Sequence, residues 1–209
     1  MQHIAVIDYG MGNLRSVSKA LEHVASGARI AVTNDPAEVA RADRVVFPGQ
    51  GAMPDCMREL AASGVGDALL EAAQTKPFLG ICLGLQMLFD ASDEGDVQGL
   101  GVLAGRVKRF PKAQMAEARL KVPHMGWNEV VQTRAHPLWA GIADQSRFYF
   151  VHSYYVEPAE TGVVAGRTHY PGAFTSCVAS ANIFAVQFHP EKSHTAGLRL
   201  LSNFVSWNP

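Results

Sequence analysis

The sequence has little of what disulfide-bonded, zinc-binding or nucleic-acid-binding proteins require. Its 3 cysteines, Cys56, Cys82 and Cys177, are an odd number at wide spacings and include no Cys-x-x-Cys pair. That pattern argues against a disulfide framework or a zinc site and indicates a reducing compartment. The 18 basic residues do not exceed the 19 acidic ones, so no surplus of positive charge is available to bind the phosphates of a nucleic acid. We therefore expect no nucleic-acid partner.

Export and membrane signals are also missing. No apolar run approaches the ~20 residues that cross a bilayer. Residues 1–8 lack the basic flank and long apolar stretch of a signal peptide, and the histidines show no metal-ligand spacing. These absences predict a cytoplasmic protein with no membrane partner, no metal and no cofactor.

Apolar material is abundant. The 209 residues are 48% hydrophobic and 18% charged, which excludes intrinsic disorder and suffices for the core of one α/β domain. No repeat, low-complexity tract or linker interrupts the chain. We expect residues 1–209 to form a single domain.

Short apolar runs alternate with helix-like segments in the first half of the chain. The expected strands are 4–8, 29–33, 44–47 (stopped by Pro48-Gly49) and 78–81, and the expected helices are 14–24 (with Asn13 as N-cap), 54–61, 65–73 and 83–91. The second half has strand-like runs at 105–110, 129–132, 148–156, 163–169, 174–179 and 183–188, and then a helix at 196–205. These patterns predict an α/β fold: a mainly parallel central sheet with helices on both faces, plus an antiparallel or mixed extension.

The most informative segment places a cysteine between a strand and a helix. Cys82 is flanked as Gly80-x-Cys82-x-Gly84, and glycines on both sides allow the sharp turn of a nucleophile elbow. At a helix N-terminus, the dipole favours a thiolate. The alternative is a small residue that packs a strand–helix joint.

A histidine and a glutamate follow the last expected strand. His189 ends that strand, and Glu191 lies two residues further on, so both side chains project to the same side of an extended chain. A carboxylate there fixes the imidazole tautomer and leaves the other ring nitrogen for a thiol. A strand-end histidine in a surface turn is the commoner fate of an isolated His-x-Glu.

A glycine turn, Gly49-Gln50-Gly51, follows the third expected strand. Acyl transfer needs backbone N–H groups that point at the developing oxyanion, and such a turn can present them. The N–H of Leu83, directly after the cysteine, is the natural second donor. An ordinary strand-ending turn remains an equal alternative.

Together, Gly-Ile-Cys-Leu-Gly-Leu-Gln (80–86), Phe-His-Pro-Glu (188–191) and Pro-Gly-x-Gly (48–51) resemble the class I (triad) glutamine amidotransferases over nearly the whole chain. Segments 8–16 and 123–128 are similar to one branch of that family, the glutaminase subunit of imidazole glycerol phosphate synthase in histidine biosynthesis.

The resemblance implies specific roles for residues. Cys82, His189 and Glu191 correspond to the catalytic triad that hydrolyses L-glutamine to glutamate and ammonia through a thioester. The residues that correspond to the oxyanion hole and the glutamine pocket are Gly49, Gln50, Gly51, Leu83, Gln86, Ser153 and Tyr154.

The resemblance also implies a partner. The ammonia would pass to a cyclase subunit with a (β/α)8-barrel fold, which makes imidazole glycerol phosphate and an aminoimidazole carboxamide ribotide. The residues that correspond to the docking face for this heterodimer are Met125, Trp127, Asn128, Tyr149 and Lys192. Gln50 departs from the small or β-branched apolar residue expected there, so we expect its longer side chain to influence how the oxyanion turn flips.

Three alternative functions remain open. The chain could be a glutaminase that serves pyridoxal phosphate, anthranilate or aminodeoxychorismate synthesis, although the His-Met-Gly-Trp-Asn segment (124–128) argues against this. It could instead be a cysteine peptidase or esterase on a similar sheet, or an inactive scaffold that only binds the barrel.

Overall fold

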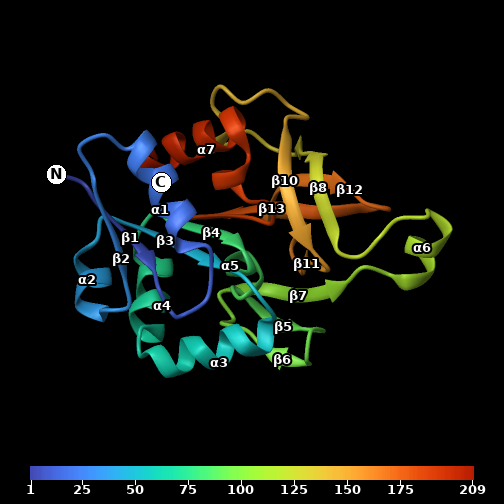
Figure 1. Ribbon diagram of the computed structural model, residues 1–209, viewed down its shortest axis with the longest axis horizontal. Helices are drawn as coiled ribbons and strands as arrows, with labels where there is room; N and C mark the ends of the chain where they lie inside the picture. Colours follow the sequence, from blue (N-terminus) through green and yellow to red (C-terminus); the bar gives the residue numbers. More distant parts are fainter.

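The computed structural model describes residues 1–209 and is built around one 12-stranded sheet (Figure 1). Five parallel strands form its first part, in the order β2-β1-β3-β4-β14. They are β1 (His3–Ile7), β2 (Arg29–Thr33), β3 (Arg44–Gly49), β4 (Phe78–Cys82) and β14 (Ile183–Val186). The carboxyl ends of parallel strands meet at one sheet edge, which is where α/β folds place their sites.

The sheet continues from β14 as a mixed extension, in the order β13-β11-β7-β5-β6. These strands are β13 (Ala173–Ser180), β11 (Tyr154–Pro158), β7 (Leu103–Arg109), β5 (Phe89–Ser92) and β6 (Val97–Gln98). Strand β12 (Val164–His169) also pairs with β13, and β9 (Val131–Gln132) pairs with β12. A separate antiparallel pair is formed by β8 (His124–Glu129) and β10 (Arg147–His152). The predicted α/β class, with a parallel centre and a mixed extension, is confirmed.

Helices cover both faces of the parallel strands. Helices α1 (Leu14–Val24) and α7 (His194–Ser206) lie on one face, and α2 (Pro36–Arg41), α3 (Met53–Ser63) and α4 (Gly66–Thr75) lie on the other (Figure 1). Along β1, Ile4 and Val6 pack against the first group, whereas Ala5 and Ile7 pack against the second. Alternate residues point to opposite faces of a strand, so a strand buried on both faces is apolar throughout.

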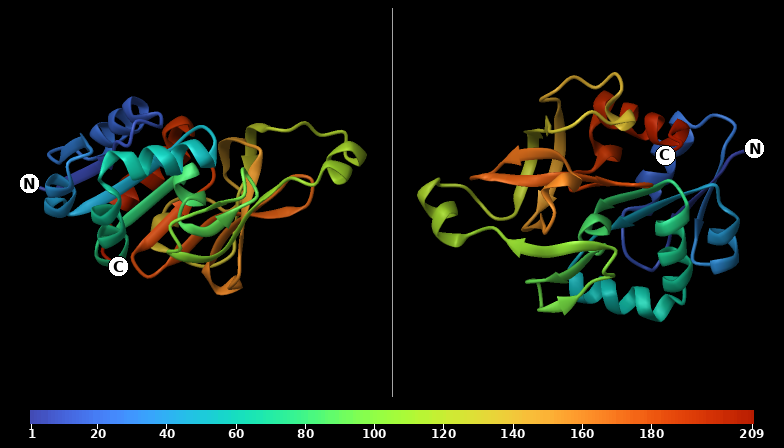
Figure 2. Two further views of the ribbon diagram at one scale, coloured as in Figure 1. Left: turned by 90° about the horizontal axis from the view of Figure 1, so that it is seen from below. Right: turned by 180° about the vertical axis from the view of Figure 1, so that it is seen from behind.

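The remaining short helices are α5 (Leu83–Gln86), α6 (Lys112–Glu117) and the 3₁₀ turns η1 (Pro137–Trp139), η2 (Thr161–Val163) and η3 (Pro190–Lys192). Helix α6 lies at the tip of a segment that extends away from the sheet (Figure 2). No helix has the length and apolar character to pass through a membrane.

The helix expected at residues 83–91 is wrong in its second half. Helix α5 ends at Gln86, and residues 89–92 form β5, which pairs with β7. Phe89 is fully buried opposite Leu103. Pairing with a strand that follows later in the chain overrides the local helical pattern.

Other boundaries also differ. Strand β3 continues through Pro48 to Gly49 instead of stopping at Phe47; β1 pairs with it only as far as Val46. The missing N–H of proline is tolerated where a strand has a neighbour on one side only. The single strand expected at 148–156 is two strands in different sheets, and the one expected at 129–132 is divided between β8 and β9. Asn13 is at the N-cap of α1, but its side chain does not cap the helix.

Candidate active site

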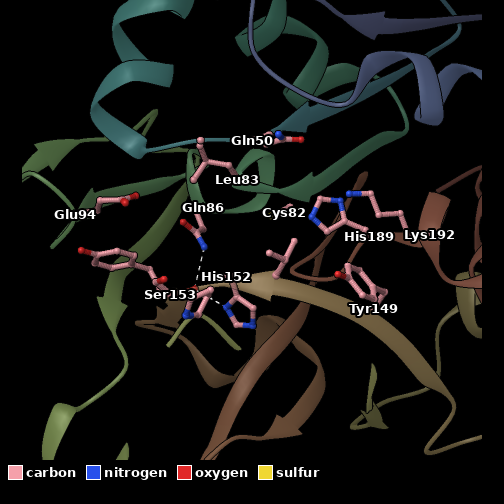
Figure 3. A pocket seen from close by; sticks show the side chains of 14 residues that line it. Gln50, Cys82, Leu83, Gln86, Glu94, Tyr149, His152, Ser153, His189 and Lys192 are labelled. Carbon is pink, nitrogen blue, oxygen red and sulfur yellow. Dashed lines mark hydrogen bonds between the residues drawn. The ribbon is translucent and has the colours of Figure 1, made fainter. Parts of the chain in front are cut away.

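A cavity of about 410 Å³ lies at the carboxyl ends of β3 and β4 and is closed on another side by the end of β10 (Figure 3). The sequence-predicted residues that line it are Gln50, Gly51, Cys82, Leu83, Gln86, Tyr149, Ser153, Tyr154, His189 and Lys192. Of the remaining predicted residues, Gly49 and Glu191 lie directly behind this lining, and Met125, Trp127 and Asn128 lie on β8. Segments far apart in the sequence therefore meet at one cavity.

Cys82 occupies a strained turn between β4 and α5. Its φ of 56° and ψ of −110° lie outside the regions that residues with a Cβ prefer. Gly84 makes the turn possible, since a Cβ there would overlap the carbonyl oxygen of Phe47, and a Cβ on Gly80 would lie 2.9 Å from that of Ala185. Helix α5 has only 4 residues, so its dipole at Cys82 is weaker than that of a helix reaching residue 91.

His189 is held by Glu191 on the side away from Cys82. Its Nδ1 lies 2.8 Å from Oε1 of Glu191, whose side chain is fully buried. Nδ1–H donates to the carboxylate, so Nε2 remains for the sulfur. The sequence predicts an extended chain from His189 to Glu191, and this is wrong. Strand β14 ends at Val186, and Glu191 lies in the 3₁₀ turn η3.

The charges around His189 favour its protonated form. Burial alone lowers the pKa of the imidazole, but the nearby Cys82 sulfur and the Glu191 carboxylate outweigh burial and raise that pKa to about 10. An imidazolium beside a sulfur nucleophile can donate a proton to a departing amine without a prior transfer from solvent.

The glycine turn packs directly on this elbow. A Cβ on Gly49 would lie 2.8 Å from the backbone nitrogen of Gly84 and 2.8 Å from the Leu83 Cβ. The Gln50 N–H donates to no backbone carbonyl, and Leu83, as the first residue of α5, has an N–H without a partner inside the helix. Two residues whose backbone N–H groups lack a backbone partner therefore line the cavity together with Cys82.

The resting turn is also held from behind. The Cys56 thiol donates to the carbonyl oxygen of Gln50 at 3.4 Å. Burial raises the pKa of Cys56, which keeps it a thiol and hence a donor. The Gln50 side chain is exposed at the mouth of the cavity.

Gln86 has only one polar atom free for a ligand. Its Nε2 donates to the carbonyl oxygen of Tyr154 at 3.0 Å and to Oε1 of Gln187 at 2.9 Å (Figure 3 shows the first). Both amide hydrogens are thereby used. Its Oε1 can accept a hydrogen bond from a ligand that carries N–H groups.

Four residues of the lining were not among the predicted site residues: Glu94, Pro123, Val151 and His152. Glu94 is the only carboxylate in the lining, and Figure 3 shows it on the far side of the cavity from His189. Its Oε2 accepts the N–H of Met53 at 2.9 Å. No sequence spacing indicates this role, because Glu94 reaches the cavity through β5, which the sequence pattern presents as helix.

The five predicted docking residues lie beside the cavity, and we call them the β8 face (Met125, Trp127, Asn128, Tyr149 and Lys192). Met125, Trp127 and Lys192 are exposed, whereas Tyr149 is half-buried, as is Asn128, whose side chain is directed toward His124 and His169. Met125 is 62% and Trp127 43% exposed. The Trp127 ring stacks on His194 and meets Tyr149 edge-on at 6.1 Å, and Lys192 Nζ lies 6.0 Å from the Tyr149 ring centroid. No three His, Cys, Asp or Glu side chains gather as ligands of a metal ion.

Comparison with known proteins agrees with this geometry. The family "Glutamine amidotransferase class-I" matches residues 5–207, and the chain belongs to this family. It is 68% identical over 211 residues to the imidazole glycerol phosphate synthase subunit HisH of Dechloromonas aromatica, covering 100% of this chain and 98% of that one. It is 65% identical over 212 residues to the HisH subunit of Aromatoleum aromaticum, covering 100% of both chains.

Solved structures share the fold at low sequence identity. A crystal structure of a glutamine amidotransferase matches with a TM-score of 0.71 at 19% identity and covers 96% of each chain. PurLQS from Thermotoga maritima matches with a TM-score of 0.71 at 16% identity and covers 97% of each chain.

Proposed function

We propose that this chain is the glutaminase subunit of imidazole glycerol phosphate synthase, with Cys82 as nucleophile, His189 as general acid and base, and Glu191 as the residue that orients His189. The observation that carries the proposal is the convergence of Cys82 and the His189–Glu191 pair at one cavity in a member of the class-I glutamine amidotransferase family. We further propose that residues 1–209 act as a single domain and that the protein works in the cytoplasm, where its 3 free cysteines stay reduced.

The geometry supports the following reaction. The Cys82 sulfur attacks the side-chain amide carbon of glutamine, and the N–H groups of Gln50 and Leu83 stabilise the oxyanion. His189 gives its proton to the amine, ammonia leaves, and a γ-glutamyl thioester remains. His189 then takes a proton from water, whose oxygen attacks the thioester carbon, and glutamate and the cysteine are released.

The remaining polar groups of the cavity suit the rest of the substrate. Gln86 Oε1 and Glu94 accept hydrogen bonds, as the α-ammonium group of glutamine requires. Ser153 and Tyr154 line the same cavity and complete the pocket.

The β8 face supports docking of a cyclase subunit, for which we propose the (β/α)8-barrel fold. Ammonia released into neutral water would mostly be protonated and would lose its nucleophilicity, so a water-poor passage must begin close to Cys82. Tyr149 and Lys192 belong to both the cavity and the β8 face. Exposed Trp and Met side chains suit a desolvated contact.

Glutamate release should depend strongly on the partner. We expect docking of the cyclase subunit to set the turn at Gly49–Gly51 and so to complete the oxyanion hole. A missing oxyanion donor costs about 10² to 10³ in rate. The rate of glutamate release should therefore rise by about 10²-fold or more when the purified cyclase subunit and its phosphorylated substrate are added. Equal rates with and without the cyclase would contradict this gating. No hydrolysis under either condition would overturn the proposed function.

Trp127→Ala supplies the matched variant for the same assay. We expect it to weaken binding of the cyclase by about 10-fold or more, or to uncouple glutamate release from synthesis, because central aromatic residues dominate interfaces. The control is Val32→Ala on β2, since Val32 is also 43% exposed. Unchanged affinity together with unchanged coupling would remove Trp127 from the interface.

Glu94→Gln should raise the KM for glutamine by about 10- to 100-fold with kcat changed by less than about 3-fold, since a hydrogen bond to a charged group contributes about 1.5 to 3 kcal/mol. The measurement is steady-state glutamate release in the complex. Asp93→Asn is the control, because Asp93 pairs with Arg106 on the surface. A fall in kcat at constant KM would show that Glu94 does not bind substrate.

A further inference from the structure

Gln187 is a completely buried polar residue next to the proposed nucleophile. Strands β14 and β4 are parallel, with Val186 opposite Ile81, so Gln187 and Cys82 follow at adjacent positions. Gln187 Nε2 lies 3.8 Å from the Cys82 sulfur, within hydrogen-bond distance for sulfur, and its side chain is 0% exposed. Gln187 and His189 are two residues apart, and His189 lines the same cavity as Cys82.

The Gln187 amide can adopt only one orientation. Its Oε1 accepts an N–H of Gln86 at 2.9 Å, and the other hydrogen of Gln86 Nε2 goes to the Tyr154 carbonyl at 3.0 Å. Turning the Gln187 amide over would set its NH₂ against the NH₂ of Gln86 and an oxygen against Cys82. The donor of Gln187 must therefore face the sulfur.

Two buried histidines hold the next group in this network. The Tyr154 carbonyl also accepts from His152 Nδ1 at 2.7 Å, and His152 Nε2 lies 2.9 Å from His124 Nδ1. Burial lowers the pKa of His152 to about 3 and that of His124 to about 4, so both rings are neutral near pH 7. A neutral ring has one donor and one acceptor, so each donates through Nδ1.

The outer end of the network is on the β8 face. Asn128 Nδ2 lies 3.2 Å from His124 Nε2 and donates to the carbonyl oxygen of His169 at 3.1 Å. Donation therefore runs in one direction from Asn128 through His124 and His152 to the Tyr154 carbonyl. Gln86 and Gln187 continue the hydrogen-bonded path from that carbonyl to the sulfur.

We propose that Gln187 is a positioning residue for the nucleophile: its amide N–H holds the Cys82 sulfur beside His189, and the buried path from Asn128 to Gln86 fixes the orientation of that amide. The inference rests on the proposed function, in which Cys82 is the nucleophile. A hydrogen bond to an ionised sulfur is stronger than one to a thiol, so the Gln187 donor also favours the reactive form.

The test is the pH dependence of Cys82 alkylation by iodoacetamide, followed by peptide mass spectrometry on the intact chain. In Gln187→Met, which keeps the length of the side chain without the donor, we expect the midpoint of the profile to rise by about one pH unit and the rate at neutral pH to fall by about 10-fold. Ser176→Ala is the control. The Ser176 hydroxyl is buried without a partner, and its carbonyl accepts the Gln187 backbone N–H at 2.8 Å.

A second variant keeps the test valid if Gln187→Met fails to fold. Gln187→Glu preserves the acceptor for Gln86 and replaces the donor toward Cys82 by an oxygen, so its midpoint should rise at least as far. A wild-type profile in a folded form of either variant would overturn the inference. Failure of iodoacetamide to label Cys82 in the wild-type chain would instead overturn the proposed function.

Discussion

Replacing Cys82 by alanine is expected to lower glutamine-dependent synthesis by the complex by at least about 10⁴-fold, because loss of a covalent nucleophile removes the thioester pathway entirely. Ammonia-dependent synthesis should stay within about 2-fold of wild type, since the acceptor chemistry belongs to the cyclase subunit. Both rates can be measured with one preparation by changing only the nitrogen source. Loss of both activities would contradict the role assigned to Cys82.

The same variant should change the titration of His189. The Cys82 sulfur is one of the two groups that raise the pKa of His189 to about 10 against the effect of burial. In Cys82→Ala that pKa should therefore fall, which NMR titration of the imidazole can follow. In the folded protein the pKa of His189 lies above the ordinary value of about 6.5, so protonation of His189 stabilises the fold. This contribution to the free energy of unfolding is fully present below pH 6.5 and is lost as the pH rises through about 10. An unchanged pKa would show that the sulfur does not act on the ring.

Gly84→Ala is expected to have the second largest effect, although it adds only one methyl group. That Cβ would overlap the carbonyl oxygen of Phe47 in β3, and backbone atoms cannot yield as a side-chain end can. We expect the free energy of unfolding to fall by about 2 to 4 kcal/mol. Where the protein still folds, the turn at Gly49–Gly51 must move away from Cys82, and glutaminase activity should fall by about 10²-fold.

Gly66→Ala is the matched control for this substitution. Gly66 is the first residue of α4, and nothing lies within 4 Å of a Cβ built there. Alanine at that position should leave stability unchanged or slightly raised and activity at the wild-type level. Chemical denaturation and glutamate release in the complex measure the two effects. A Gly84→Ala protein with wild-type stability and activity would show that the elbow and the turn are not tightly packed.

Much of the fold was predictable because its signals are local. The first helix and the second strand occupy the expected residues 14–24 and 29–33, since strand and helix periodicity can be seen within a few residues. The turn at Cys82 was predictable for the same reason: its flanking glycines permit a conformation that other residues resist. The pairing of His189 with Glu191 was also visible, although the turn that brings them together is 3₁₀ and not extended.

The sequence by itself therefore determined most of the strands and helices up to residue 82, the sharp turn at Cys82 and the residue types for acyl transfer, because backbone preference and side-chain chemistry belong to short segments. Only the tertiary structure decided that residues 89–92 form a strand, that Glu94 faces the cavity and that Gln187 contacts the Cys82 sulfur. Each of these depends on pairing or packing between segments distant in the chain. The free energy of such contacts exceeds local preference, and no short window of sequence contains both partners.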